Sequence, residues 1–288
     1  MYNRWFAHYT HSLAGKRVAV CGATGGIGEA LCRHLARLGA QLWLCCRSEA
    51  KTQALIDSLR EEYPDLAARF VPLDLEDAAS VCAAAEILAQ TPPHVLIHNA
   101  GVYAIPRHIT AQDVDNVFAI NCLGPYALTK RLLAPMATVG GHVVVVGSIA
   151  HNYAKIDPTD PDFAAQKAAS KVYGNAKRHL MLALYEEFED VKGVTLSVVH
   201  PGITFTNITN HYPKWLFCII KHPMKVIFMP PRRAALSVLR GVFEPTTYGQ
   251  WIGPWLFDVW GLPRKRTLRT FTRDEAKTAH ANLERLAY

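Results

Sequence analysis

The sequence predicts an α/β protein whose core is a doubly wound parallel sheet of about seven strands, with helices on both faces. Short apolar runs rich in β-branched residues alternate along the chain with longer stretches of helical periodicity. These apolar runs are continuous rather than interrupted by polar residues, which is typical of strands buried on both faces. No low-complexity linker interrupts the 288 residues, so we expect a single domain.

The strands and helices follow one another at the spacing that a parallel sheet requires. We expect strands over the apolar runs at residues 17–21, 41–46, 69–73, 94–98, 142–146 and 194–199. Between them, helices are expected over residues 26–38, 49–62, 78–89, 113–137 and 165–188. Glycines open the first of these helices, and Asp77 is well placed to cap the third.

The pattern changes after residue 207. Residues 211–231 mix aromatic residues, lysines and prolines without a clean period. A helix is then expected over residues 232–243, a short strand over 250–253 and a polar terminal helix over 274–286. We therefore divide the chain into an N-terminal arm (1–15), a core (16–207) and a C-terminal elaboration of the same domain (208–288).

Composition and charge exclude several classes of protein. With 50% hydrophobic and 19% charged residues, the chain is not intrinsically disordered. The longest apolar run, residues 215–220, falls far short of the roughly 20 residues that a membrane span needs. The net charge of +7 fits a polyanionic ligand, an anionic membrane or nucleic acid. No nucleic-acid recognition motif accompanies the basic residues 264–269, so we expect no nucleic-acid partner.

The cysteines and histidines indicate neither disulfides nor a metal site. Seven cysteines, an odd number without a CxxC pair, are typical of reduced thiols in a cytosolic-type compartment. Residues 1–11 lack the continuous apolar stretch of a signal peptide. The histidines lack partners at the spacing of a motif such as HExxH, so we expect no metal.

A glycine-rich turn follows the first strand and opens the first helix. It contains Gly22, Thr24, Gly26, Ile27 and Gly28. Glycines at this place let the backbone approach a pyrophosphate, and the helix N-terminus offers free N–H groups to its oxygens. The spacing fits either of two patterns, because Gly25 can stand in for Gly26. An ordinary tight loop is the alternative, but the position predicts a Rossmann-type dinucleotide site.

The residues that follow the second, third and fourth predicted strands indicate which dinucleotide binds. Arg47 and Ser48 follow the second strand, where a carboxylate would bind the ribose diol of NAD. A guanidinium offers forked donors to a 2′-phosphate, so the sequence favours NADP(H) over NAD, unless Arg47 is only a solvated residue at a helix start. Asp74 could accept from the adenine amine or cap a helix. Small residues in Asn99-Ala100-Gly101 let the cofactor ribose approach the fourth strand.

Two Tyr-x-x-x-Lys pairs, Tyr126/Lys130 and Tyr173/Lys177, are candidates for proton transfer. A spacing of four places both side chains on one helix face, where the ammonium favours the phenolate. The pair at Tyr173 follows a strand that ends in Ser148, whose hydroxyl could hold a substrate oxygen beside the phenol. Tyr126 has no such serine before it and is expected in the core.

In this order, the elements resemble those of the short-chain dehydrogenases/reductases over roughly residues 13–253. The matching elements are residues 13–16 with the glycine turn, Asp74-Leu75, Asn99-Ala100-Gly101, Asn121 with Gly124, Ser148, Tyr173 with Lys177, and Pro201-Gly202 with Thr206. The resemblance implies that Tyr173 is the acid/base and that Lys177 lowers its pKa and binds the nicotinamide ribose. It further implies that Ser148 orients the substrate, that Asn121 serves a proton relay, and that residues 201–206 line the nicotinamide end.

The run from Ser148 to His151 is similar to the Ser-x-Ala-His of the retinol dehydrogenase and protochlorophyllide reductase-like branch. That branch mostly uses lipophilic substrates. Gly147 departs from the family, which commonly has a second serine there. The expected activity is NADP-dependent hydride transfer between nicotinamide and a lipophilic aldehyde, ketone or secondary alcohol. A non-catalytic NADP(H)-sensing protein and an NAD-dependent epimerase or dehydratase of the extended branch are the alternatives.

The apolar segment at residues 212–228 is open to three interpretations. In the family, this region covers the substrate, so a lid is the first. A helix packed on the core or a homodimer face is the second, and a peripheral contact with a membrane surface is the third. The sequence is thus compatible with a cytoplasmic protein, with or without contact to a membrane.

Overall fold

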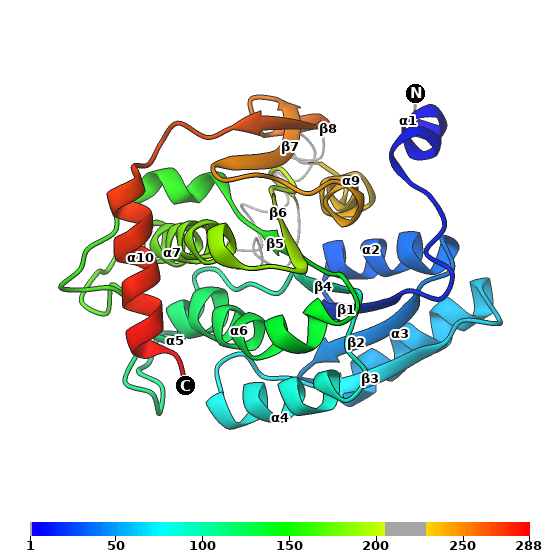
Figure 1. The fold of residues 1–288 in the computed structure, drawn as a ribbon, viewed down its shortest axis with the longest axis horizontal. Helices are drawn as coiled ribbons and strands as arrows, with labels where there is room; N and C mark the ends of the chain where they lie inside the picture. The colour runs from blue at the N-terminus through cyan, green and yellow to red at the C-terminus, as the bar shows by residue number, and fades with distance from the viewer. Residues whose placement is uncertain (1, 205–228) are drawn as a thin grey trace, which may run out of the picture.

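The computed structural model describes residues 2–204 and 229–288, and the fold within these ranges is a three-layer α/β sandwich (Figure 1). Eight strands form one sheet in the order β3-β2-β1-β4-β5-β6-β7-β8. Adjacent strands pair in parallel from β3 through β7, whereas β8 runs antiparallel to β7. The predicted doubly wound parallel sheet is therefore confirmed. The strands are β1 (Arg17–Cys21), β2 (Gln41–Cys46), β3 (Ala68–Pro72), β4 (Val95–His98), β5 (Gly141–Val146), β6 (Val194–Val199), β7 (Gln250–Leu256) and β8 (Trp260–Thr267).

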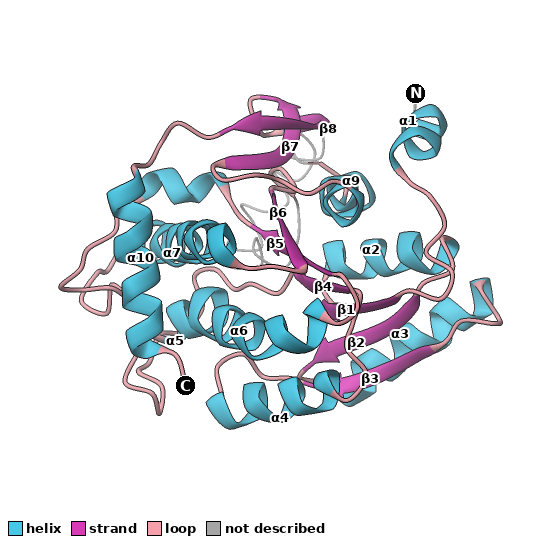
Figure 2. Ribbon diagram, viewed as in Figure 1, coloured by secondary structure: helices cyan, strands magenta, loops and turns pink. Residues whose placement is uncertain are grey.

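Helices cover both faces of the sheet (Figure 2). One side carries α4 (Ala78–Ala89), α5 (Asn116–Phe118), α6 (Gly124–Ala137) and α7 (Ala169–Asp190), with α10 (Arg273–Leu286) packed on α7. The other side carries α2 (Gly26–Arg37), α3 (Glu49–Glu62) and α9 (Pro231–Phe243), and α1 (Tyr2–Tyr9) lies beyond them.

Strands β1 to β7 each contribute to two separate cores. In β1, Ala19 and Cys21 pack with α4, α6 and α7, whereas Val18 and Val20 pack with α2, α3 and α9. All four residues are completely buried. This burial explains why the strands are apolar at every position instead of every second one.

Some element boundaries differ from the predicted ones. The helix expected over residues 113–137 begins at Asn116, because the Asp115 carboxylate accepts from the N–H groups of Val117 and Phe118 and caps the helix there. A π-helical turn, η1 (Ala119–Leu123), separates α5 from α6. The helix expected over residues 165–188 begins at Ala169 and continues to Asp190.

Helix α1 and strand β8 were not predicted. The arm over residues 1–15 contains α1, which buries Trp5 and Phe6. Strand β8 pairs with β7 although it contains Pro263 and three consecutive basic residues, because it lies at the sheet edge where one side of the strand is exposed. Within the described ranges, no helix has the length and apolar character needed to cross a membrane.

Candidate active site

A cavity of about 420 Å³ opens at the carboxyl ends of β1 to β4, where open α/β sheets bind ligands. It is lined by the glycine turn and by the segments that follow the next three parallel strands. The lining residues are Gly22, Thr24, Gly25, Gly26, Ile27, Cys45, Cys46, Arg47, Ser48, Lys51, Leu73, Asp74, Leu75, Asn99, Ala100, Gly101, Val102 and Ile120. Eleven of the predicted cofactor residues are among them, so the structure gathers most of that set around one cavity.

The glycine turn is shaped by close backbone packing. Gly22 has a φ of +80°, and a Cβ there would lie 2.6 Å from the Cα of Ala100. Asn99 holds the turn by donating from Nδ2 to the carbonyl oxygen of Gly22 at 2.9 Å. Gly28 does not line the cavity; it packs against the backbone of Gly22 and lets α2 lie close to the turn.

The N-terminus of α2 faces the cavity with its own donors free. Gly25 is the N-cap residue and supplies no side-chain cap, so the first N–H groups of the helix have no side-chain acceptor there. Thr24, Gly26 and Ile27 line the cavity beside them. An uncapped helix start beside a cavity is chemically suited to a phosphate or pyrophosphate.

The opposite end of the cavity carries two cations. Arg47 is exposed, and within the described residues it forms no hydrogen bond or ion pair. Ser48 caps α3 by accepting from the N–H of Lys51 at 3.4 Å, which places Lys51 in the first turn of that helix. Sequence reasoning missed Lys51; its position three residues after the cap was the available signal.

Asp74 and Asp77 have different roles. Asp77 caps α4, because its carboxylate accepts from the N–H of Ala79 at 2.9 Å. Asp74 is not the cap of that helix; its carboxylate accepts from the N–H of Glu76 at 3.1 Å and it lines the cavity. Asp74 is therefore placed to contact a ligand, as the sequence predicts.

The predicted catalytic side chains gather between α7 and the segment that follows β5. Tyr173 and Lys177 lie one turn apart on α7, and the Ser148 hydroxyl, shortly after β5, is near enough to the Tyr173 phenol to lower its pKa. The Lys177 Nζ donates to the carbonyl oxygen of Val146 at 3.0 Å and lies 5.8 Å from the Tyr173 ring centroid. A Cβ on Gly101 would lie 3.4 Å from that Nζ, so the lysine reaches the edge of the cavity.

Asn121 is buried in the π-helical turn and also reaches Gly101. Its Oδ1 accepts from the N–H of Val102 at 3.1 Å, and its Nδ2 donates to the carbonyl oxygens of Val102 and Val117 at 2.9 and 2.8 Å. The side chain thus holds the segment after β4 against the helix. A π-helical turn is a frequent feature of functional sites, and here it places the amide beside the lysine.

Burial opposes the charged forms of both members of the pair. It raises the pKa of the Tyr173 phenol to about 12; the Ser148 hydroxyl lowers this pKa and nearby Tyr103 raises it. Burial also lowers the pKa of Lys177 to about 8.

The remaining predicted residues lie elsewhere or outside the described ranges. Pro201 and Gly202 follow β6 and are buried, but they do not line the cavity. Thr206 and the apolar segment at 212–228 lie outside the described residues. Gly147, the departure from the family, packs on α7: a Cβ there would lie 2.6 Å from the Sδ of Met181.

A buried network that sequence reasoning missed supports the Ser148 loop. The His151 Nδ1 donates to the carbonyl oxygen of Ser148 at 2.6 Å. Arg178, 3% exposed, donates to the carbonyl oxygen of His151 at 3.0 Å and binds both carboxylate oxygens of Glu275. Helix α10 is therefore tied to the segment that carries Ser148. No local sequence signal pairs residues 97 positions apart.

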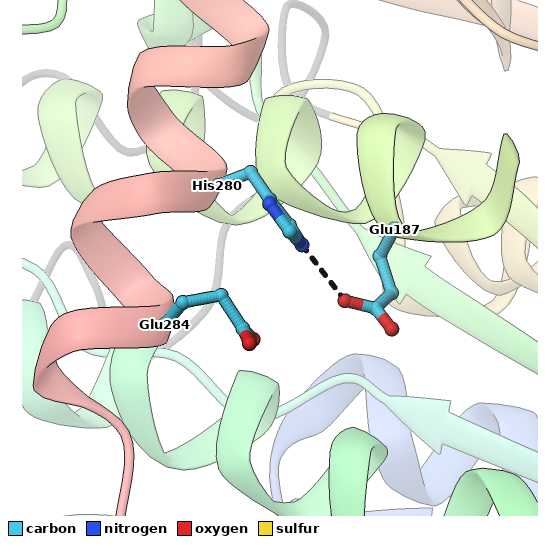
Figure 3. A group of neighbouring side chains, drawn as sticks. All are labelled: Glu187, His280 and Glu284. Carbon is cyan, nitrogen blue, oxygen red and sulfur yellow. Dashed lines mark hydrogen bonds and ion pairs between the residues drawn. The ribbon is translucent and has the colours of Figure 1, made fainter. Parts of the chain in front are cut away.

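The second Tyr-x-x-x-Lys pair belongs to a cluster between α6, α7 and α10. Figure 3 shows Glu187, His280 and Glu284, whose ligand atoms all lie within 4.8 Å of one another. The Lys130 Nζ lies 2.9 Å from Glu187 and 3.2 Å from Glu284, and the buried Tyr126 donates to both carboxylates. The ammonium therefore supplies the positive charge in this cluster. The prediction that Tyr126 packs in the core is confirmed.

The comparisons with known proteins agree with this geometry. The model of the short chain dehydrogenase family matches residues 16–216. Dehydrogenase/reductase SDR family member 13 from Bos taurus is 33% identical over 79% of this chain, and the match spans 62% of that relative, less than two thirds of its length. Retinol dehydrogenase 12 from Mus musculus is 32% identical over 79% of the chain and 73% of the relative. Polyprenol dehydrogenase from Mus musculus is 31% identical over 82% of the chain and 73% of the relative.

Solved structures share the fold. An uncharacterized protein from Mycobacterium paratuberculosis superimposes with a TM-score of 0.78 at 24% identity, over 96% of this chain and 94% of that one. A short-chain dehydrogenase from Sphingobium yanoikuyae in complex with NADPH has a TM-score of 0.60 at 23% identity, over 78% of this chain and 84% of that one.

Proposed function

This chain belongs to the short-chain dehydrogenase family, in its retinol dehydrogenase-like branch, and on that premise we propose that it is an NADP-dependent oxidoreductase. Its reaction interconverts a lipophilic aldehyde or ketone and the corresponding alcohol. The observation that carries the proposal is the grouping of Ser148, Tyr173 and Lys177, in which Lys177 reaches Gly101 in the lining of the cavity that the glycine turn opens.

The cavity residues fit a dinucleotide. The uncapped start of α2 suits the pyrophosphate, and Asp74 is placed to accept from the adenine amine. Arg47 and Lys51 put two positive charges at the end where the adenosine ribose would lie. Two cations without a facing carboxylate on β2 favour a 2′-phosphate, so the proposed cofactor is NADP(H).

The chain's own residues manage the proton. A nicotinamide cofactor held by the cavity residues would supply the hydride for the carbonyl carbon. Tyr173 gives its phenolic proton to the carbonyl oxygen, so that C=O becomes CH–OH, and it takes the proton back when an alcohol is oxidised. Ser148 holds the substrate oxygen beside the phenol. The Lys177 ammonium stabilises the phenolate that the transfer leaves behind.

The substrate class is proposed from the relatives and from the site. The names of two relatives, a retinol and a polyprenol dehydrogenase, specify long apolar alcohols. In the proposed layout, residues 16–207 form the dinucleotide-binding and catalytic core and residues 208–288 form the substrate lid and an elaboration. Pro201, Gly202 and Thr206 belong to the nicotinamide end.

The test is the Tyr173→Phe variant. Turnover of NADPH with lipophilic aldehydes and ketones should fall at least ~100-fold, because the phenol is the acid. Binding of NADPH, followed by fluorescence titration, should stay unchanged since Tyr173 does not line the nucleotide cavity. Near wild-type turnover in this variant would overturn the assignment of Tyr173.

A further inference from the structure

The hairpin formed by β7 and β8 ends in three consecutive exposed apolar residues. Trp255 is 58% exposed, Leu256 40% and Phe257 84%. These exposed fractions are high for apolar side chains, which are usually buried in a protein core. Phe257 and Asp258 also have φ angles of +50° and +59°, a left-handed conformation that is costly for a bulky residue. The hairpin therefore presents an aromatic tip to its surroundings at the expense of backbone strain.

One face of this hairpin and helix α1 line a groove of about 510 Å³. Trp255 and Leu262 come from the hairpin, and Trp5 and Tyr9 come from α1. Trp5 is 6% exposed, and its buried Nε1 has no hydrogen-bond partner within the described part of the chain. A donor thus remains unused in a groove with aromatic walls. Figure 1 shows the hairpin and α1 at the same end of the molecule, away from α10.

The rim of this groove is basic. Arg264 and Lys265 line it on the hairpin side, and Arg4 and His8 line a second pocket that shares Trp5, Tyr9 and Leu262 with it. Lys265 pairs with Glu244. Arg4 and Arg264 are exposed, and they form no ion pair among residues 2–204 and 229–288. The surface therefore combines apolar side chains that can be inserted with positive charges that are not neutralised.

We propose that this hairpin–α1 surface, defined by Arg4, Trp5, Tyr9, residues 255–257, Leu262 and Arg264, docks on the headgroup layer of a bilayer that contains anionic phospholipids. Aromatic side chains prefer this layer because it accommodates both their apolar rings and their polar atoms. Unpaired arginines are attracted by anionic headgroups. The groove gives an acyl chain or headgroup a place between α1 and the hairpin.

The small size of the apolar tip favours a bilayer over a second protein. Stable protein interfaces use about 20 to 30 residues on each side with close shape complementarity. Three exposed apolar residues on one hairpin fall well below this, whereas a bilayer accepts a few inserted side chains without a matching shape.

The surface is also connected to the candidate active site. A Cβ on Gly202 would lie 2.8 Å from the carbonyl oxygen of Val259 and 3.0 Å from the Cγ of Pro254, both in the hairpin. The end of β6 therefore packs directly against the proposed docking element. A lipophilic substrate dissolved in the bilayer would then be close to the site. This last link rests on the proposed function, but docking itself does not.

The experiment is co-sedimentation of the full chain with vesicles of phosphatidylcholine, with and without phosphatidylserine. The wild type should bind the vesicles that contain phosphatidylserine. Phe257→Ser should weaken binding at least about tenfold, because it removes a large apolar side chain from the inserted tip. Arg264→Gln should weaken it about fivefold, and only with phosphatidylserine present. Both residues are exposed, so the variants should fold; circular dichroism checks this.

Matched control variants distinguish binding through this surface from non-specific adsorption to vesicles. Ile109→Ser removes an exposed apolar side chain (51% exposed) elsewhere, and Arg285→Gln removes an exposed positive charge from α10. Both should bind as the wild type does. The proposal is overturned if the wild type does not bind, if Phe257→Ser binds equally well, or if that variant only abolishes self-association seen by analytical ultracentrifugation. None of these outcomes depends on Tyr173 chemistry.

Discussion

Tyr173 and Lys177 lie where burial opposes the charged form of each side chain. Burial raises the pKa of Tyr173 to about 12 and lowers the pKa of Lys177 to about 8. The protein thus holds a 3% exposed ammonium with a single backbone acceptor, the carbonyl oxygen of Val146. Such strain at a functional residue is expected to reduce stability in exchange for activity.

The Lys177→Met variant tests this cost. Lowering the lysine pKa from 10.5 to about 8 destabilises the fold by about 3 kcal/mol below pH 8. Replacing the lysine by methionine removes this destabilisation, but the variant also loses the hydrogen bond to Val146, which costs about 1 kcal/mol. We expect the free energy of unfolding at pH 7, measured with denaturant and no cofactor, to rise by about 2 kcal/mol while turnover falls sharply. The gain should vanish above pH 10.5, where the lysine is neutral in both states. A variant less stable than wild type at pH 7 would contradict this.

Arg47 is the residue on which the choice of cofactor is expected to depend. Arg47→Asp places a carboxylate where the 2′-phosphate would lie, so the ratio of kcat/KM with NADPH to that with NADH should fall at least about tenfold. Arg131→Asp makes the same charge change on α6, away from the cavity, and should leave the ratio unchanged. An unchanged ratio in Arg47→Asp would assign the phosphate to Lys51 instead.

Helix α10 contributes no predicted site residue, but its side chains support the segment that carries Ser148. Its N-terminal residue Glu275 binds Arg178, which holds the carbonyl oxygen of His151, whose ring contacts the carbonyl oxygen of Ser148. At its other end, Glu284 and His280 join the cluster with Lys130. Helix α10 thus braces both α7 and the loop that carries Ser148.

Glu275→Gln leaves the buried Arg178 without its counter-charge. Removing one partner of a buried ion pair costs about 3 to 5 kcal/mol, so we expect unfolding at lower denaturant concentration. We also expect kcat to fall more than KM rises, because the Ser148 loop loses its brace. Arg273 is also on α10, and it forms an exposed ion pair with Glu189 of α7. Arg273→Gln breaks this pair and should change stability by less than about 1 kcal/mol. Equal effects of the two substitutions would refute the bracing role.

For the whole molecule, the acid limit of stability is set by buried histidines. Burial lowers the pKa of His98 and His200 to about 3 and that of His179 to about 4, against a usual 6.5. Between these values the unfolded chain binds more protons than the folded one, so stability falls as pH falls.

Each of these three histidines should contribute about 1.4 kcal/mol per pH unit between pH 6.5 and 4, so the three together contribute about 4 kcal/mol per pH unit. The melting temperature should therefore drop steeply over this range in calorimetry. His98→Asn should reduce the slope of stability against pH by the amount that corresponds to about one proton. Replacing the exposed His8 should leave this slope unchanged. A flat profile from pH 6.5 to 4 would contradict this account.

The sequence predicted most of the sheet because burial on both faces leaves a local signature. Six continuous apolar runs correspond to β1–β6, and the glycine turn lies where the first run ends. Strand β8 had no such signature, because its exposed side and Pro263 hide the pairing with β7. The start of α5 depended on the Asp115 cap, which competes with a periodicity that begins earlier.

By itself, the sequence determined the order of the elements, the cavity residues from Gly22 to Gly101, and the choice of Tyr173 over Tyr126, because each depends on residues near one another in the chain. Only the tertiary structure decided that Lys51 lines the cavity together with Arg47 and that Glu275 braces the Ser148 loop through Arg178. It also decided that α1 and the β7–β8 hairpin line one groove. These contacts join residues brought together by packing, and their chemistry depends on burial, which no local pattern records.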